Sequence, residues 1–246
     1  MNYSVAVDAL QNKVILVTGA SDGIGKQAAI TYAAHGATVI LLGRSEDKLQ
    51  QTYAEIVSAG YPEARVIALD MQKASRYDYQ TLIHDIEQQC GQLDGLLHSA
   101  GLLGEISPFE AITEHTYDQV MQVNVKAQLL LTQAALPLIK RSPQGRIVFT
   151  SSTVGHSGRS GWASYSISKF ATEGMMQILA DELRDTPLRV NAINPGGTRT
   201  AMRAKAYPQE DANRLKTPQE IMPLYLYLMA RESQHVHGQC LDAQPK

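Results

Sequence analysis

Short apolar runs rich in β-branched residues alternate along the chain with longer segments whose apolar residues recur at helical spacing. Continuous apolar runs are typical of parallel strands buried on both faces, and helices usually connect such strands. The pattern therefore predicts an α/β fold, a Rossmann-type doubly wound domain with a seven-stranded parallel sheet and helices on both faces. We expect strands at Val14–Thr18, Thr38–Leu42, Arg65–Leu69, Leu93–His98, Arg146–Ser151, Arg189–Asn194 and Gln239–Asp242.

The segments between these strands predict six helices, three of which run into a glycine suited to end a helix. The expected ranges are Gly23–Gly36, Glu46–Gly60, Ser75–Cys90, Glu114–Lys140, Ala163–Asp185 and Pro218–Arg231. Residues 196–216 are polar, charged and poor in period, so we interpret them as an irregular loop over a substrate. The length of 246 residues and the 44% hydrophobic content favour a single domain over residues 1–246.

The charge is nearly balanced, with 22 basic against 24 acidic side chains and a net charge of −2. This balance does not favour nucleic acid or a membrane surface as a partner. Cys90 and Cys240 lie far apart without the spacing of a metal site, so we interpret them as partly buried thiols in a reducing compartment and expect no metal. The N-terminal residues lack the pattern of a secretion signal, and no apolar run approaches a membrane span. We expect a soluble, cytoplasmic protein.

The segment TGASDGIG, residues 18–25, follows the first expected strand and opens the first expected helix. The missing side chains at Gly19, Gly23 and Gly25 let backbone N–H groups approach a pyrophosphate at the positive end of the helix. Ser21 and Ile24 belong to the same turn, and we expect both to contact the dinucleotide. The spacing is G-x-x-x-G-x-G rather than G-x-G-x-x-G, so a plain strand-to-helix turn is the alternative.

Arg44 stands after the second expected strand, where an acidic residue would bind the bare ribose hydroxyls of NAD(H). A cation at this position favours a 2′-phosphate and therefore NADP(H) over NAD(H), although an exposed arginine without a ligand is the alternative. Asp70 ends the third expected strand. It could accept a hydrogen bond from the adenine amino group or cap the next helix.

Tyr165 and Lys169 stand one helical turn apart in YSISK, with Ser152 thirteen residues upstream of the tyrosine. Hydride transfer to a carbonyl needs a proton donor, and a tyrosine acting near pH 7 needs its pKa lowered by about 3 from the usual value near 10. We expect the ammonium of Lys169 to supply part of that lowering, since residues four apart share a helix face. Ser152 would hydrogen-bond the substrate oxygen as charge develops on it, with Ser151 as a register alternative.

These motifs resemble those of the single-domain short-chain dehydrogenases/reductases, and the resemblance runs from about Lys13 to Ala243. Within that family the chain is most similar to the YciK-type bacterial oxidoreductases. The family's TGxxxGxG turn is complete here, and its catalytic set of Asn, Ser, Tyr and Lys corresponds to Asn124, Ser152, Tyr165 and Lys169. The resemblance implies that Asn124 holds a water linking the lysine to solvent. The alternative is a helix-interior asparagine that bonds its own backbone.

The family's Asn-Asn-Ala-Gly stretch after the fourth strand appears in this chain as HSAG, residues 98–101. Since the family's stretch approaches the ribose, the resemblance implies that Ala100 and Gly101 contact the cofactor. His98 departs from the family's pattern. It either titrates near neutral pH or is a buried histidine with a structural role.

The resemblance also places the loop after the sixth strand at the nicotinamide end of the dinucleotide, where we expect contacts from Pro195, Gly196, Thr198 and Thr200. The substrate pocket should lie between residues 152–162 and 196–216, because both segments follow the carboxyl ends of strands. Trp162 and Met202 could supply apolar contact there or serve only as packing. The basic side chains of the second segment could meet an acidic substrate group, although the acidic residues beside them favour plain solvated charge.

The residues and the resemblance predict an oxidoreductase that transfers a hydride between NADP(H) and a small carbonyl or alcohol substrate, with Tyr165 as general acid and base. One alternative is a regulatory protein that binds NADP(H) and senses redox state without useful turnover. Another is a non-redox isomerase or epimerase on the same scaffold. Residues 114–140 and 163–185 carry apolar residues on more than one helix face, so we expect a homodimer or homotetramer, with burial against the sheet alone as the alternative.

Overall fold

Seven parallel strands form one sheet at the centre of the computed structural model, which describes residues 3–245. The spatial order is β3-β2-β1-β4-β5-β6-β7. This confirms the predicted doubly wound topology, because successive strands are added on one side of β1 up to β3 and on its other side from β4 onward. The strands are β1 (Val14–Thr18), β2 (Thr38–Gly43), β3 (Arg65–Ala68), β4 (Gly95–His98), β5 (Arg146–Thr150), β6 (Arg189–Asn194) and β7 (Cys240–Asp242). In β1, β4 and β5 every residue is buried, as expected of strands covered on both faces.

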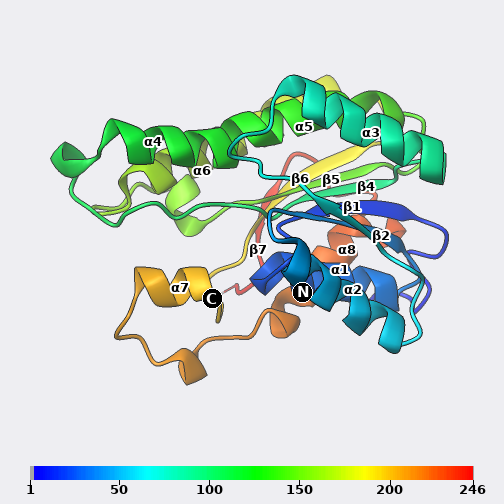
Figure 1. The fold of residues 1–246 in the computed structure, drawn as a ribbon, viewed down its shortest axis with the longest axis horizontal. Coiled ribbons are helices and arrows are strands. Elements are labelled where there is room, and N and C mark those ends of the chain that lie inside the picture. Colours follow the sequence, from blue (N-terminus) through cyan, green and yellow to red (C-terminus); the bar gives the residue numbers. More distant parts are fainter. Residues whose placement is uncertain (1–2, 246) are drawn as a thin grey trace.

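Helices cover both faces of the sheet (Figure 1). One layer consists of α1 (Gly23–Ala34), α2 (Glu46–Ser58) and α8 (Met222–Met229), and the opposite layer of α3 (Arg76–Cys90), α4 (Glu114–Met121), α5 (Ala127–Ile139) and α6 (Ala163–Glu182). One cluster of buried apolar side chains lies between each helix layer and the sheet. The carboxyl ends of the strands are left open, and this is where ligands bind in such sheets.

The helix predicted over Glu114–Lys140 is interrupted by one π turn (Gln122–Lys126), which joins α4 to α5. The helical backbone continues through the turn, as the dihedral angles of Met121 and Ala127 show. The predicted unbroken α-helix is therefore wrong in its middle. A π turn inside an α-helix frequently marks a functional site, and this one carries Asn124.

Residues 196–216 are more ordered than predicted. They contain α7 (Ala201–Ala206) and a short 3₁₀ turn (Ala212–Arg214), and a parallel bridge between Thr198 and Lys216 closes the segment at its base. Thr200 caps α7 by accepting a hydrogen bond from the backbone N–H of Arg203. The expectation of an irregular loop was wrong because the bridge between Thr198 and Lys216 and the contact of Lys205 with Gly104 join residues that are distant in the sequence.

The remaining helix ends differ by a few residues from the prediction. The sixth predicted helix begins as a 3₁₀ turn, so that only Met222–Met229 is α-helical, and α6 ends at Glu182. None of the helices within residues 3–245 combines the length and apolar character needed to cross a lipid bilayer.

Candidate active site

A cleft of about 780 Å³ lies over the carboxyl ends of the central strands. It is bordered by the turns after β1, β2, β4, β5 and β6, and by α7 on its outer side. All the residues predicted to bind the cofactor line this cleft, namely Gly19, Ser21, Gly23, Ile24, Gly25, Arg44, Asp70, Ala100, Gly101, Tyr165, Lys169, Pro195, Gly196, Thr198 and Thr200. Ser152 also lines it, whereas Asn124 lies behind the wall.

The glycine turn after β1 packs closely against the turn after β4 and is hydrogen-bonded to it. Gly19 has a φ of +70°, and a Cβ atom there would lie 2.9 Å from the backbone of Ala100. The hydroxyl of Thr18 accepts hydrogen bonds from the N–H groups of Ser99 and Ala100, each at 3.0 Å. A Cβ on Gly25 would lie 2.3 Å from the Gly19 carbonyl oxygen. Glycine is therefore required for the packing of the turn as well as for the approach of a ligand.

Two cations stand at the end of the cleft formed by β2 and α2. Arg44 follows β2 and is exposed, and Lys48 lies in the first turn of α2. Within the described chain, neither side chain forms an ion pair or a hydrogen bond. Lys48 was not among the predicted residues, although its position four residues after Arg44 was a usable signal. The pair offers a site for an anionic group.

Asp70 borders the same end of the cleft, but it does not cap the next helix. Its carboxylate accepts a hydrogen bond from the backbone N–H of Gln72 at 3.1 Å. Ser75 caps α3 instead, in a capping box with Asp78. The helix-capping alternative for Asp70 is therefore wrong, because the helix begins five residues farther on than that role requires.

Tyr165, Lys169 and Ser152 come together at the opposite end of the cleft. Ser152 is the second residue after β5, and the other two lie near the start of α6. The ammonium of Lys169 lies 5.4 Å from the centre of the Tyr165 ring and donates a hydrogen bond to the Thr150 carbonyl oxygen at 2.7 Å. The hydroxyl of Ser151 turns away and donates to Glu173 at 2.5 Å, so Ser152 is the serine beside the phenol.

The protein's own groups raise the pKa of the candidate tyrosine. Burial raises the pKa of Tyr165 to about 12, against a smaller lowering by the hydrogen bond with Ser152. The protein's side chains alone therefore do not lower this pKa below 10, because the cost of burying the phenolate is larger than the stabilisation they supply. Burial also lowers the pKa of Lys169 to about 8, and the nearby carboxylate of Glu173 acts in the opposite direction.

Asn124 is fully buried in the π turn and joins two elements of the site. Its side-chain oxygen accepts from the N–H of Leu102 at 2.7 Å. Its amide nitrogen donates to the Leu102 carbonyl at 2.8 Å and to the Ser168 hydroxyl at 3.0 Å. The alternative of an asparagine bonding its own backbone is therefore wrong. The Asn124 side chain thus joins the segment after β4 to α6. Its contact on α6 is Ser168, the residue before Lys169.

His98 is a buried structural residue. Its ring stacks on Phe149 with 4.8 Å between ring centres, and Nε2 lies 2.8 Å from the Thr132 hydroxyl. Burial, and to a smaller extent the positive charge of Lys169, lower the pKa of His98 to about 3. The alternative of titration near neutral pH is wrong, because the interior accommodates only the neutral ring.

The walls beside the phenol are apolar. Leu103, Val154 and Tyr165 form a small buried cluster, against which Trp162 and Met202 pack. The centres of the Trp162 and Tyr165 rings lie 5.6 Å apart. This arrangement suits a ligand with an apolar group beside its reactive atom.

The basic side chains of residues 196–216 are largely bound within the protein. Arg203 forms two hydrogen bonds of 2.6 Å with Glu210 and stacks on Tyr207. Lys205 donates to the Gly104 carbonyl oxygen across the cleft at 3.3 Å, and Arg199 donates to the Ala212 carbonyl at 2.7 Å. These internal partners argue against an acidic substrate group held by the segment.

Comparisons with known proteins place these features in a wider group. A family model described as short chain dehydrogenase matches residues 13–211. The uncharacterized oxidoreductase YciK of Escherichia coli strain K12 is 53% identical over 245 residues, covering 100% of this chain and 97% of that protein.

Solved structures agree with this sequence relationship. The crystal structure of E. coli YciK superimposes with a TM-score of 0.97 at 53% identity and covers 100% of both chains. A short chain dehydrogenase from E. coli CFT073, complexed with NADPH, superimposes with a TM-score of 0.96 at 53% identity and covers 98% of this chain and 100% of its own.

Proposed function

Because the chain belongs to the short-chain dehydrogenase family of oxidoreductases, we propose that it transfers a hydride between NADP(H) and a carbonyl or alcohol substrate. The observation that carries the proposal is the position of Ser152 and Lys169 beside the phenol of Tyr165, inside a cleft that ends at Arg44. A proton donor and an anion site at opposite ends of one cleft are what a reductase using NADPH requires.

The residues around the cleft fit the cofactor. The glycine turn leaves room for a pyrophosphate at the start of α1, and the unpaired Arg44 and Lys48 suit a 2′-phosphate. Ala100 and Gly101 would contact the ribose, and the segment after β6 the nicotinamide. A relative 53% identical to this chain was crystallised with NADPH, which supports the choice. When bound, the cofactor supplies the hydride and, in its oxidised form, a positive charge near the phenol.

Tyr165 would hold the proton that the substrate oxygen receives. With a pKa of about 12 the phenol is neutral near pH 7 and can donate. The phenolate left behind would be stabilised by the adjacent ammonium of Lys169. The hydroxyl of Ser152 would donate a hydrogen bond to the substrate oxygen while negative charge develops there. Asn124 would keep the segment bearing Lys169 in place, and its link to solvent through a water stays a prediction.

The apolar walls indicate the substrate class. Trp162, Met202 and Leu103 border the cleft beside Tyr165, so the reactive carbonyl should carry an apolar substituent. The internal ion pair of Arg203 with Glu210 leaves that cation unsuited to a substrate carboxylate. We therefore propose uncharged aldehydes or ketones as substrates, with residues 196–216 forming the wall that selects among them.

We also propose that residues 1–246 act as one dinucleotide-binding and catalytic domain, and that copies of the chain associate as a homodimer or homotetramer. Support for association comes from exposed apolar side chains on α5 and α6. Leu129, Phe170 and Ile178 are 43%, 47% and 63% exposed in the isolated chain. Both thiols are unpaired, which supports a reducing compartment such as the cytoplasm.

A spectrophotometric screen tests the function. Wild-type protein and Tyr165→Phe are assayed with aldehydes, ketones and alcohols, using NADPH and NADH, with the exposed Tyr77→Phe as control. We expect turnover to fall by about 10²- to 10⁴-fold in Tyr165→Phe alone, with binding of NADPH retained. Equal turnover in wild type and Tyr165→Phe would overturn the catalytic assignment.

The same screen separates the other two functions. NADPH binding without turnover on any substrate, unchanged by Tyr165→Phe, would favour the regulatory protein. Conversion of an alcohol without net consumption of the cofactor would favour the isomerase.

A further inference from the structure

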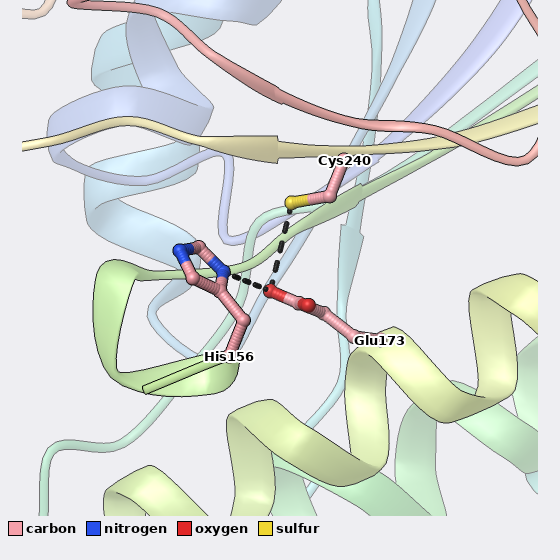
Figure 2. Close-up of side chains that lie close together, drawn as sticks. All are labelled: His156, Glu173 and Cys240. Atoms are coloured by element: carbon pink, nitrogen blue, oxygen red, sulfur yellow. Dashed lines mark hydrogen bonds and ion pairs between the residues drawn. The ribbon is translucent and has the colours of Figure 1, made fainter. Parts of the chain in front are cut away.

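A second cluster of reactive side chains lies outside the residues that line the cleft (Figure 2). Glu173 projects from α6, His156 from the segment after β5, and Cys240 from β7. One carboxylate oxygen of Glu173 lies 3.1 Å from His156 Nδ1 and 3.5 Å from Cys240 Sγ. The three residues are distant in the sequence, so no spacing motif could reveal them.

The distances match those between ligands of a tetrahedral zinc ion. Typical bond lengths are about 2.3 Å to sulfur and about 2.0–2.1 Å to nitrogen and oxygen, which place neighbouring ligands about 3.3–3.6 Å apart. The two measured separations from the Glu173 oxygen lie within about 0.3 Å of this range. All three ligand atoms lie within 4.8 Å of one another. The separation of the thiol sulfur from the imidazole nitrogen would therefore have to shorten by at most about 1.2 Å.

The chemistry of the donors also suits zinc. Sulfur, imidazole nitrogen and carboxylate oxygen are its usual ligands, and three protein ligands with one open position form a common arrangement. Ser151 donates to the same Glu173 oxygen at 2.5 Å, as the outer partner of a metal-bound carboxylate does. His156 is 46% exposed at its side chain and Cys240 is exposed, so an ion can enter from solvent while Glu173 lies 9% exposed beneath them.

We propose that His156, Glu173 and Cys240 form a binding site for a divalent transition-metal ion, with Zn²⁺ as the best match and water as the fourth ligand. The ion would take the place of the thiol hydrogen that Cys240 directs at the carboxylate and of the close approach of His156 Nδ1 to it. Binding forms a zinc–sulfur bond and releases the thiol proton to solvent, and the neutral imidazole binds through Nδ1 with its proton on Nε2. No electron transfer is involved.

The position of the site gives it a regulatory consequence that rests on the proposed function. Glu173 lies one helical turn after Lys169, and Ser151 links it to the strand end that carries Ser152. A Cβ added to Gly155 would lie 2.9 Å from the Glu173 carboxylate and 3.0 Å from Lys169 Cβ, so this region is tightly packed. An ion bound to Glu173 adds positive charge beside Lys169 and offsets the carboxylate that favours its ammonium form. It also holds Ser151 next to Ser152. Occupancy therefore lowers turnover, because the ammonium is less able to stabilise the phenolate of Tyr165.

Cobalt absorption tests binding without relying on activity. Co²⁺ is titrated into the full-length, reduced protein, followed by Zn²⁺ as competitor. We expect one equivalent of Co²⁺ to produce a thiolate-to-cobalt absorption band that Zn²⁺ abolishes. Cys240→Ser and His156→Gln should bind at least about tenfold more weakly, since even outer partners of a metal contribute about 10- to 100-fold in affinity. Cys90→Ser, which changes the chain's other thiol, is the matched control and should bind like wild type.

Two results would overturn the site: no cobalt–thiolate band in wild type, or an equal band in Cys240→Ser. Thermal unfolding of each variant verifies that it folds. Turnover is measured separately with and without Zn²⁺, and we expect inhibition in wild type and Cys90→Ser but not in Cys240→Ser. Binding without inhibition would refute the regulatory consequence alone. A protein without any turnover would contradict the proposed function and leave the cobalt result intact.

Discussion

Mild acid should destabilise this protein through His98. The ring is buried, Nε2 bonds the Thr132 hydroxyl, and Nδ1 has no hydrogen-bond partner within residues 3–245. Burial lowers the pKa of His98 from 6.5 to about 3 in the folded protein. Between these two pH values the imidazole is protonated in the unfolded chain but not in the folded protein. The free energy of unfolding is therefore highest above pH 6.5 and declines as the pH falls toward 3.

The magnitude follows from the two pKa values. Linkage gives a loss of about 2 kcal/mol between pH 7 and pH 5, and up to about 5 kcal/mol once the pH is below both values. For a chain of this size, about 2 kcal/mol corresponds to a decrease of about 4–8 °C in Tm. Carboxylates also titrate in this range, so the prediction concerns the difference between wild type and a variant without the imidazole.

Urea unfolding at several pH values measures this difference. His98→Gln keeps an amide near the position of Nε2 and removes the ionisable ring. Its stability at pH 7 should be lower because the stacking on Phe149 is lost, but its decline between pH 7 and pH 5 should be smaller by about 2 kcal/mol. His84→Gln, on the exposed face of α3, should decline like wild type. Parallel declines in wild type and His98→Gln would refute the buried neutral imidazole.

Three further outcomes are expected. Arg44→Ala should raise the KM for NADPH by about 10- to 150-fold, since a charged hydrogen bond contributes about 1.5–3 kcal/mol. The KM for NADH should stay unchanged. Equal changes for both cofactors in steady-state assays would contradict the phosphate site. The pH profile of kcat/KM should decline as the pH rises through about 8, where Lys169 loses its proton. A profile that stays level from about pH 7 to about pH 9 would refute its role as a cation. Gly19→Ala should destabilise more than Gly60→Ala in urea unfolding, because both have positive φ but only Gly19 meets backbone atoms, at 2.9 Å; equal losses would refute the clash.

The sheet was predictable because each strand carries its own signal. A strand buried on both faces is mostly apolar, so the run itself identifies it, as in β1, where the observed ends match the expected ones. The Tyr165 and Lys169 pair was predictable for a similar reason. Two residues four apart share one face of any helix, so a single helix suffices to bring them together.

The errors lie where distant residues decide. Residues 196–216 have little local period, and α7 is stabilised by the pairing of Arg203 with Glu210 and by Lys205 across the cleft. The π turn at Asn124 coincides with hydrogen bonds to Leu102 and Ser168, which belong to other elements. The raised pKa of Tyr165 in the protein alone was likewise not predictable, because burial depends on everything packed around the phenol.

The amino-acid order alone determined the alternation of strands and helices, the glycine turn and the spacing of the candidate proton donor and its cation, because these depend on local periodicity and single elements. Only the tertiary structure decided which charges remain unpaired, which ionisable groups are stripped of water, and that Glu173, His156 and Cys240 meet at one point. Those properties arise from the packing of segments far apart in the chain, and desolvation and ligand geometry exist only after that packing has formed.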